Sequence, residues 1–203
     1  YKETSKIITL LTRELGKISV MVLGAHRPKS RKGSLTQKYC AGYFDLNEGR
    51  QVYYLQDVRL IQSFYGIRCN LKRLAIAEVA LELIDRTYGS NTNQSQSFSI
   101  LYSFLKVVNQ LEANFRLYIV AFIIKWLSVL GYRPELTACV NCGSVHYDEM
   151  YFSIPYGGLI CNKCKGTVPG RAISVESIQV MVNILFTPFK ELYKIKVDFS
   201  RLI

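Results

Sequence analysis

Four cysteines stand in two matched pairs, and they are the residues of this sequence best suited to chemistry. The motifs "CVNC" (139–142) and "CNKC" (161–164) are separated by 18 residues. A Cys-x-x-Cys pair on a tight turn aims two sulfurs at one point, and two such turns facing each other supply the four ligands of a tetrahedral zinc ion, at about 2.3 Å each. The spacing therefore predicts a structural Zn²⁺ site whose ligands are Cys139, Cys142, Cys161 and Cys164.

Other interpretations of these cysteines compete with zinc. A thioredoxin-like redox pair needs only one such motif, in a βαβ context that the sequence lacks. Two disulfides would require an oxidising compartment, and four reduced buried thiols would not need this spacing. A catalytic metal using the nearby His146 is disfavoured because four cysteines complete the coordination. The isolated Cys40 and Cys69 are expected to be small buried apolar residues.

Positive charge is concentrated in the first third of the chain. The formal net charge is +11, and residues 1–73 hold 14 lysines and arginines against 5 acidic residues. No acidic residue lies between Glu14 and Asp45, a stretch that contains "GAHRPKSRKG" (24–33). An imbalance of this size predicts a polyanionic partner, either nucleic acid or an anionic membrane surface, whereas any single cation is more simply a solvated side chain.

A membrane role is disfavoured by the apolar segments. The most apolar run, 117–132, is interrupted by Lys125 and preceded by Arg116, whereas a spanning helix needs about 20 mainly apolar residues. The run is predicted to be a buried helix. The first residues mix charged and apolar side chains, so no signal peptide is predicted.

The elements that must position these residues change character along the chain. Strands are predicted over 6–12 and 17–24, with Gly16 in the turn, and over 37–47 and 51–64. Short strands joined by glycine turns suggest a small barrel or sandwich, in which the basic segment 24–36 is a long loop.

Beyond about residue 67 the apolar period becomes helical. Helices are predicted over 70–88, 98–111, 113–131 and 174–186, with a polar linker over 89–97 and Ser174 as an N-cap. Between the last two helices, a strand pair turning at Gly157–Gly158 would bring the cysteine pairs together. The predicted fold class is α+β.

Catalytic constellations are missing from the sequence. It has no glycine-rich phosphate loop, no Gly-x-Ser-x-Gly and no carboxylate cluster in the basic region that could hold magnesium. We therefore expect a binding protein and not an enzyme, and a nuclease or transferase is the least favoured hypothesis.

Three phrases, in this order, resemble the bacterial recombination mediator RecO: "TRELGKISVMVLGAHRPKS", "VLGYRPELTACVNC" and "GGLICNKC". The resemblance implies an N-terminal OB-fold barrel over 1–65 that lacks its first strand, then an α-helical domain over 66–203 with an inserted zinc module at about 137–168. It also implies a non-enzymatic DNA repair protein of the bacterial cytoplasm and nucleoid. Such proteins bind single- and double-stranded DNA, promote annealing, and act with RecR on strands coated by single-strand binding protein.

The resemblance also suggests where DNA would bind. Arg27, Lys29 and Arg31 match the family's basic barrel loop, and OB-type barrels bind single strands through a basic groove with stacking aromatics. The expected DNA-binding residues are Arg27, Lys29, Arg31, Lys32, Lys38, Arg13 and Lys17, and Arg50 extends the same path. The tyrosines at 39, 43, 53 and 54 are either stacking platforms or core residues. The alternative function is a protein adaptor with incidental DNA affinity, whose helical region offers a groove to an acidic, hydrophobic tail such as that of the single-strand binding protein.

Overall fold

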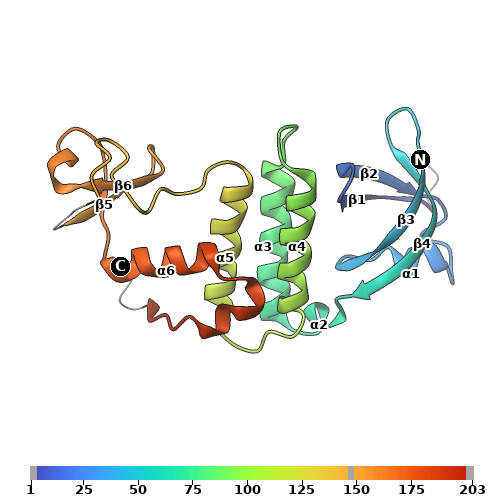
Figure 1. The fold of residues 1–203 in the computed structure, drawn as a ribbon. Coiled ribbons are helices and arrows are strands. Elements are labelled where there is room, and N and C mark those ends of the chain that lie inside the picture. Colours follow the sequence, from blue (N-terminus) through green and yellow to red (C-terminus); the bar gives the residue numbers. More distant parts are fainter. Residues whose placement is uncertain (1–3, 146–148, 200–203) are drawn as a thin grey trace. The chain divides into compact units, whose positions relative to one another are not determined.

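The computed structural model describes residues 4–145 and 149–199. The chain divides into two compact units, Tyr1–Phe115 and Arg116–Ile203, called unit 1 and unit 2 below. The α+β class predicted from the sequence is confirmed, because a four-stranded sheet and long helices both occur (Figure 1). The division predicted after residue 65 stays a prediction. Within the described residues, no helix combines the length and the apolar character needed to cross a membrane.

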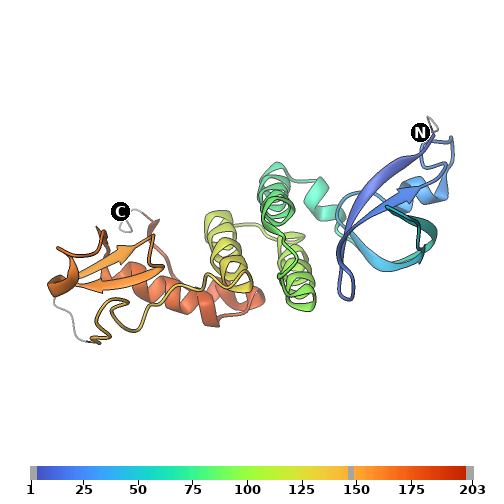
Figure 2. The same ribbon diagram turned by 90° about the horizontal axis from the view of Figure 1, so that it is seen from above.

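Unit 1 begins with two antiparallel hairpins. The first pairs β1 (Lys6–Thr12) with β2 (Gly16–Val22), and the second pairs β3 (Cys40–Asn47) with β4 (Tyr53–Ser63). A short parallel pairing of β2 with β4 joins the hairpins, giving the strand order β1-β2-β4-β3. The sheet curls around its own apolar face (Figure 2), which buries Val20, Val22, Ala25, Leu55 and Val58.

The basic segment 24–36 contains a helix where the sequence predicted a loop. Residues Arg31–Leu35 form α1, and Ser30 caps it by accepting a hydrogen bond from the Gly33 N–H at 3.1 Å. Leu35 packs against the core of the sheet, and Lys32 Nζ donates to the Leu55 carbonyl at 3.2 Å. This segment, expected to be a loop, is therefore tied to the sheet.

Three helices complete unit 1: α2 (Tyr65–Arg68), α3 (Leu71–Thr87) and α4 (Gln94–Val108). Asn70 caps α3 by accepting from the Lys72 and Arg73 N–H groups. Asn93 caps α4, so this helix begins four residues earlier than the polarity of 89–97 predicted. A side-chain amide at the N-cap satisfies an N–H group that would otherwise have no partner, which extends the helix into polar sequence.

Unit 2 is built on two helices and a small sheet. Helix α5 (Phe115–Val129) buries Phe122 and Trp126, whose rings are nearly parallel at 6.5 Å. The sheet has the order β6-β5-β7, from β5 (Met150–Ser153), β6 (Gly158–Cys161) and β7 (Arg171–Ala172). Helix α6 (Val175–Phe186) follows, and its N-cap is Ser174, as predicted. The 3₁₀ helices are η1 (Asn162–Cys164) and η2 (Phe189–Lys194).

The small sheet separates two apolar clusters. Leu159 packs with Ile178 of α6 in one cluster, whereas its neighbour Ile160 packs with the cysteines in the other. Successive side chains of a strand point to opposite faces, so a single strand serves both clusters. The three buried cysteines, Cys139, Cys161 and Cys164, thereby pack on the face of the sheet opposite to α6.

Candidate metal centre and basic surface

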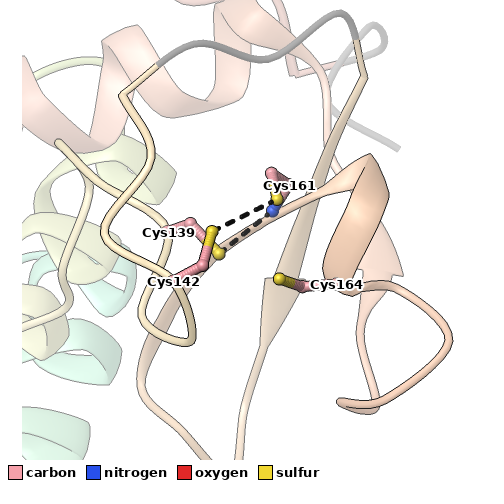
Figure 3. A group of neighbouring side chains, drawn as sticks. All are labelled: Cys139, Cys142, Cys161 and Cys164. Atoms are coloured by element: carbon pink, nitrogen blue, oxygen red, sulfur yellow. Dashed lines mark hydrogen bonds between the residues drawn. The ribbon is translucent and has the colours of Figure 1, made fainter.

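The four cysteines of the two motifs lie together, as predicted. Cys139 and Cys142 come from the turn before β5, Cys161 ends β6, and Cys164 lies in η1 (Figure 3). Their Sγ atoms all lie within 4.8 Å of one another, and those of Cys142 and Cys161 are 3.7 Å apart. The group could hold a metal ion.

The first cysteine pair sits on a turn that depends on glycine. The Gly143 N–H donates to the Cys139 carbonyl at 2.8 Å, and the Cys139 N–H donates to the Ser144 carbonyl at 2.8 Å. Gly143 has φ +73°, in the left-handed region that a residue without Cβ adopts at little cost. The turn joins the small sheet because the Val140 N–H donates to the Leu159 carbonyl at 2.8 Å.

The site is mostly closed to solvent, and its surroundings act in opposite directions on the thiols of Cys139 and Cys142. Cys139, Cys161 and Cys164 are buried and Cys142 is exposed. Burial alone would raise the pKa of the Cys139 thiol, but backbone hydrogen bonds from Cys161, Cys142 and Asn141 lower that pKa to about 6. The Ser144 N–H lowers the pKa of Cys142, but hydrogen bonds with the three other thiols raise it to about 11. A cation at the centre would stabilise all four thiolates together.

Sequence reasoning missed one polar contact of the sulfurs. The Asn141 side-chain amide donates to Cys164 Sγ at 3.3 Å, from the opposite motif. The Cys161 N–H also donates to Cys139 Sγ at 3.4 Å (Figure 3). No signal in the motif letters predicts the Asn141 contact, because it depends on how closely two segments 23 residues apart approach. His146 lies outside the described residues.

The residues predicted to contact DNA fall into two groups. Four of them already have partners within unit 1: Lys17 pairs with Asp85, Lys38 with Glu78, Lys32 with a backbone carbonyl, and Arg13 stacks over Phe98 at 5.4 Å. The other three are exposed and, within the described part of the chain, make no side-chain hydrogen bond or ion pair. They are Arg27, Lys29 and Arg31, from the segment around α1.

The four tyrosines considered for stacking also separate. Tyr39 is buried and its hydroxyl donates to the Glu78 carboxylate, while Tyr53 packs against the core of the sheet. Tyr43 and Tyr54 are exposed on the outer face. Tyr43 faces Arg59 directly across β3 and β4, and the guanidinium carbon lies 4.8 Å from the ring centre.

The isolated cysteines do not match the expectation of burial. Cys40 is half-buried and Cys69 is exposed. Cys69 lies just after α2, a helix of four residues that buries only Ile67. The prediction is therefore wrong for Cys69, because this helix is too short to cover its last turn.

The fold and the cysteine cluster describe a protein with a basic unit that combines a four-stranded sheet with helices, and a second unit of helices and a small sheet that carries a candidate metal module. The family model for the Recombination protein O N-terminal domain matches residues 1–64, and the model for its C-terminal domain matches residues 68–201. The chain belongs to the RecO family of DNA repair proteins.

Individual relatives carry the same name. The chain is similar to the DNA repair protein RecO of Acetivibrio thermocellus, with 31% identity over 98% of this chain and 79% of the relative. It is 30% identical to the RecO of Alkaliphilus metalliredigens over 98% of this chain and 81% of the relative. It is 38% identical to the RecO of Bacillus subtilis over 84% of this chain and 66% of the relative.

Proposed function

We propose that the chain is a non-enzymatic recombination mediator that binds single- and double-stranded DNA and promotes annealing. It acts with RecR on strands coated by single-strand binding protein, on nucleoid DNA in the bacterial cytoplasm. Membership of the RecO family supports a role in DNA repair. The observation that carries the DNA-binding proposal is the exposed group Arg27, Lys29 and Arg31, whose charges have no partner within the described part of the chain.

Unit 1 is proposed to be an OB-type barrel. That fold is a five-stranded Greek-key barrel whose strands and loops bind oligonucleotides. The strand order β1-β2-β4-β3, with one parallel pairing between two hairpins, supports this assignment. Cations on such a barrel would neutralise phosphates on two strands at once, which lowers the repulsion that opposes annealing.

The ion held by the four cysteines is proposed to be a structural Zn²⁺. Soft thiolates in a four-sulfur set favour zinc among the common divalent ions. A tetrahedron with zinc–sulfur bonds of about 2.3 Å has edges of roughly 3.8 Å. The 3.7 Å between the Sγ atoms of Cys142 and Cys161 fits that edge. Because four protein ligands leave no open position, the ion would stabilise the module and would not act on a substrate.

The decisive test is binding of a fluorescent single-stranded oligonucleotide across a salt series. About six phosphate contacts would give a slope of log affinity against log salt near −4 for single strands. The triple variant Arg27→Ala/Lys29→Ala/Arg31→Ala removes three of those contacts, so its slope should be shallower by about 2. A matched control is Lys190→Ala/Lys194→Ala in unit 2, whose slope should equal that of the wild type.

Either of two results would contradict this proposal. If the affinity of the wild type for DNA did not change with salt, the protein would make no phosphate contacts, and the proposal would fail. A triple variant with an unchanged slope would mean that the segment around α1 does not meet DNA. That second result would favour the adaptor function, with these cations facing an acidic protein.

A further inference from the structure

A hollow of about 360 Å³ opens on the outer face of unit 1, next to the loop between β3 and β4. It is lined by residues of β2, β4 and that loop: Met21, Arg50, Gln51, Val52 and Tyr54. Met21 and Tyr54 lie side by side because they are register partners in the parallel pairing of β2 with β4. The hollow is thus built across the junction of the two hairpins.

Tyr54 presents its ring to this hollow. Its neighbours Tyr53 and Leu55 point into the core, so Tyr54 points outward, and it is 38% exposed. The backbone of Gly49 lies against one edge of the Tyr54 ring. A Cβ at Gly49 would lie 2.6 Å from Tyr54 Cε2, so only glycine lets the loop backbone lie this close.

The chemistry of the lining suits a flat heteroaromatic ring. Tyr54 offers a π surface and Met21 a soft apolar floor, which suits contact with aromatic rings. The Arg50 guanidinium and the Gln51 amide, both exposed, supply hydrogen-bond donors and an acceptor at the rim. The size falls at the lower end of the ~300–1,000 Å³ usual for small-molecule sites.

The charges near this hollow are of both signs. Glu48 and Arg50 both belong to the loop between β3 and β4 and carry opposite charges. Asp45 and Asp57 face each other across β3 and β4 on the same outer face. This mixed charge is less suited to a phosphate than the exposed cations Arg27, Lys29 and Arg31 are, so the hollow is better suited to a base.

We propose that this hollow binds one unstacked base of single-stranded DNA, with Tyr54 as the stacking platform and Arg50 and Gln51 contacting the base edge. The inference rests on the proposed function, because it assumes that single-stranded DNA reaches unit 1. The proposal assigns phosphate binding and base binding to two different parts of unit 1. The cations around α1 hold phosphates, and the hollow holds a base.

The test compares two oligonucleotides of equal length and charge, one normal and one with an abasic stretch. Wild-type protein should bind the abasic strand less tightly. Tyr54→Ala should lose affinity for the normal strand by about 5-fold or more, as expected for one stacked base, and should discriminate less between the strands. Its salt slope should match that of the wild type because no phosphate contact is removed.

Two further variants separate stacking from folding. Tyr54→Phe keeps the ring and should bind the normal strand like the wild type. Tyr156→Ala removes an exposed tyrosine from unit 2 and should change neither affinity. Circular dichroism of each variant checks that the fold is intact.

The outcomes distinguish this inference from the proposed function. If Tyr54→Ala binds both strands like the wild type while Arg27→Ala/Lys29→Ala/Arg31→Ala loses affinity, the base site is wrong and DNA binding stands. If Tyr54→Phe binds the normal strand as weakly as Tyr54→Ala does, the affinity depends on the tyrosine hydroxyl and not on stacking. That result also overturns the inference. If wild-type protein binds neither strand, the proposed function itself fails.

Discussion

Asn141 is a polar neighbour of the candidate metal site and is not one of its four sulfur ligands. Its amide N–H reaches Cys164 Sγ at 3.3 Å and stabilises negative charge on that sulfur. Replacing a polar group that hydrogen-bonds a metal ligand typically costs about 10- to 100-fold in metal affinity. In this chain the contact also links the two cysteine motifs.

Replacing Asn141 should loosen the metal while sparing the fold. We expect Asn141→Ala to release zinc to a chromogenic chelator about 10-fold faster than the wild type, because the Cys164 thiolate loses a donor. Asn141→Asp should release it at least as fast, since a carboxylate donates no hydrogen bond. Asn162→Ala, an exposed asparagine in the other motif, is the matched control. Equal release rates for all four proteins would show that the amide contributes nothing.

The four cysteines could be predicted from the sequence because their spacing is itself geometric information. The same is true of Ser174, whose hydroxyl caps α6 as expected. The partners of Lys17 and Lys38 could not be predicted. They lie on α3, 68 and 40 residues away, and only the packing of α3 beside the sheet brings the charges together.

At the scale of elements, Glu78 connects α3 to the residues that directly precede β3 in unit 1. Its carboxylate accepts hydrogen bonds from the Tyr39 hydroxyl and from Lys38 Nζ. Tyr39 has φ +61°, a left-handed conformation that is costly for a bulky residue. Burial and then the Glu78 hydrogen bond raise the pKa of Tyr39, so this tyrosine remains a donor at any physiological pH.

The stability supplied by Glu78 should depend on pH. The hydrogen bond from Tyr39, followed by that from Lys38, lowers the pKa of Glu78 below its ordinary value of 4.5. This contribution is therefore complete above pH 4.5 and is lost as the pH falls through the lower pKa of the folded state. Glu78→Gln should destabilise the protein by about 1 kcal/mol at pH 7, a modest value because the side chain is 42% exposed.

Thermal unfolding at pH 7 and near pH 3 measures this effect. The melting temperatures of Glu78→Gln and the wild type should differ at pH 7 and converge in acid. Glu82→Gln removes a carboxylate from the exposed Glu82–Arg86 pair of the same helix and should be nearly neutral at both values. If the melting temperatures of Glu78→Gln and the wild type differed as much near pH 3 as at pH 7, the Glu78 charge would have no role in stability.

Arg73 joins the ends of three helices in unit 1. Its guanidinium donates to the carbonyls of Leu111 and Asn109 past the end of α4, and to that of Gly66 in α2. A Cβ at Gly66 would lie 2.3 Å from the Asn109 carbonyl oxygen, so the close approach requires glycine. The helical periodicity of 70–88 predicted α3 but placed no constraint on Arg73, because its partners lie beyond the helix.

At the scale of the whole molecule, metal and DNA binding are expected to be separable. The four cysteines of the two motifs belong to unit 2, and the exposed cations Arg27, Lys29 and Arg31 belong to unit 1. Purified protein should contain one zinc per chain. Removing it with a chelator under reducing conditions should lower the unfolding temperature substantially, because structural zinc contributes directly to folding free energy.

DNA affinity should survive that treatment within about twofold, since the phosphate contacts proposed in unit 1 do not involve the metal. Cys161→Ser provides the same comparison by mutation, and Cys40→Ser is its control. A parallel loss of DNA affinity, with unit 1 still folded, would mean that the module itself meets DNA. Lys163, Lys165 and Arg171 would then be the contacts to examine.

The parallel pairing of β2 with β4 also has a consequence for how the protein folds. Each hairpin is local and can form early, but the pairing of Val20 with Tyr53 must close a chain segment of more than 30 residues. Such non-local closure is slow compared with hairpin formation. The closed segment contains Arg27, Lys29 and Arg31, and the pairing itself forms one wall of the hollow beside Tyr54. A nascent or partly folded chain would therefore bind DNA weakly. Its affinity for DNA would rise only after β2 pairs with β4.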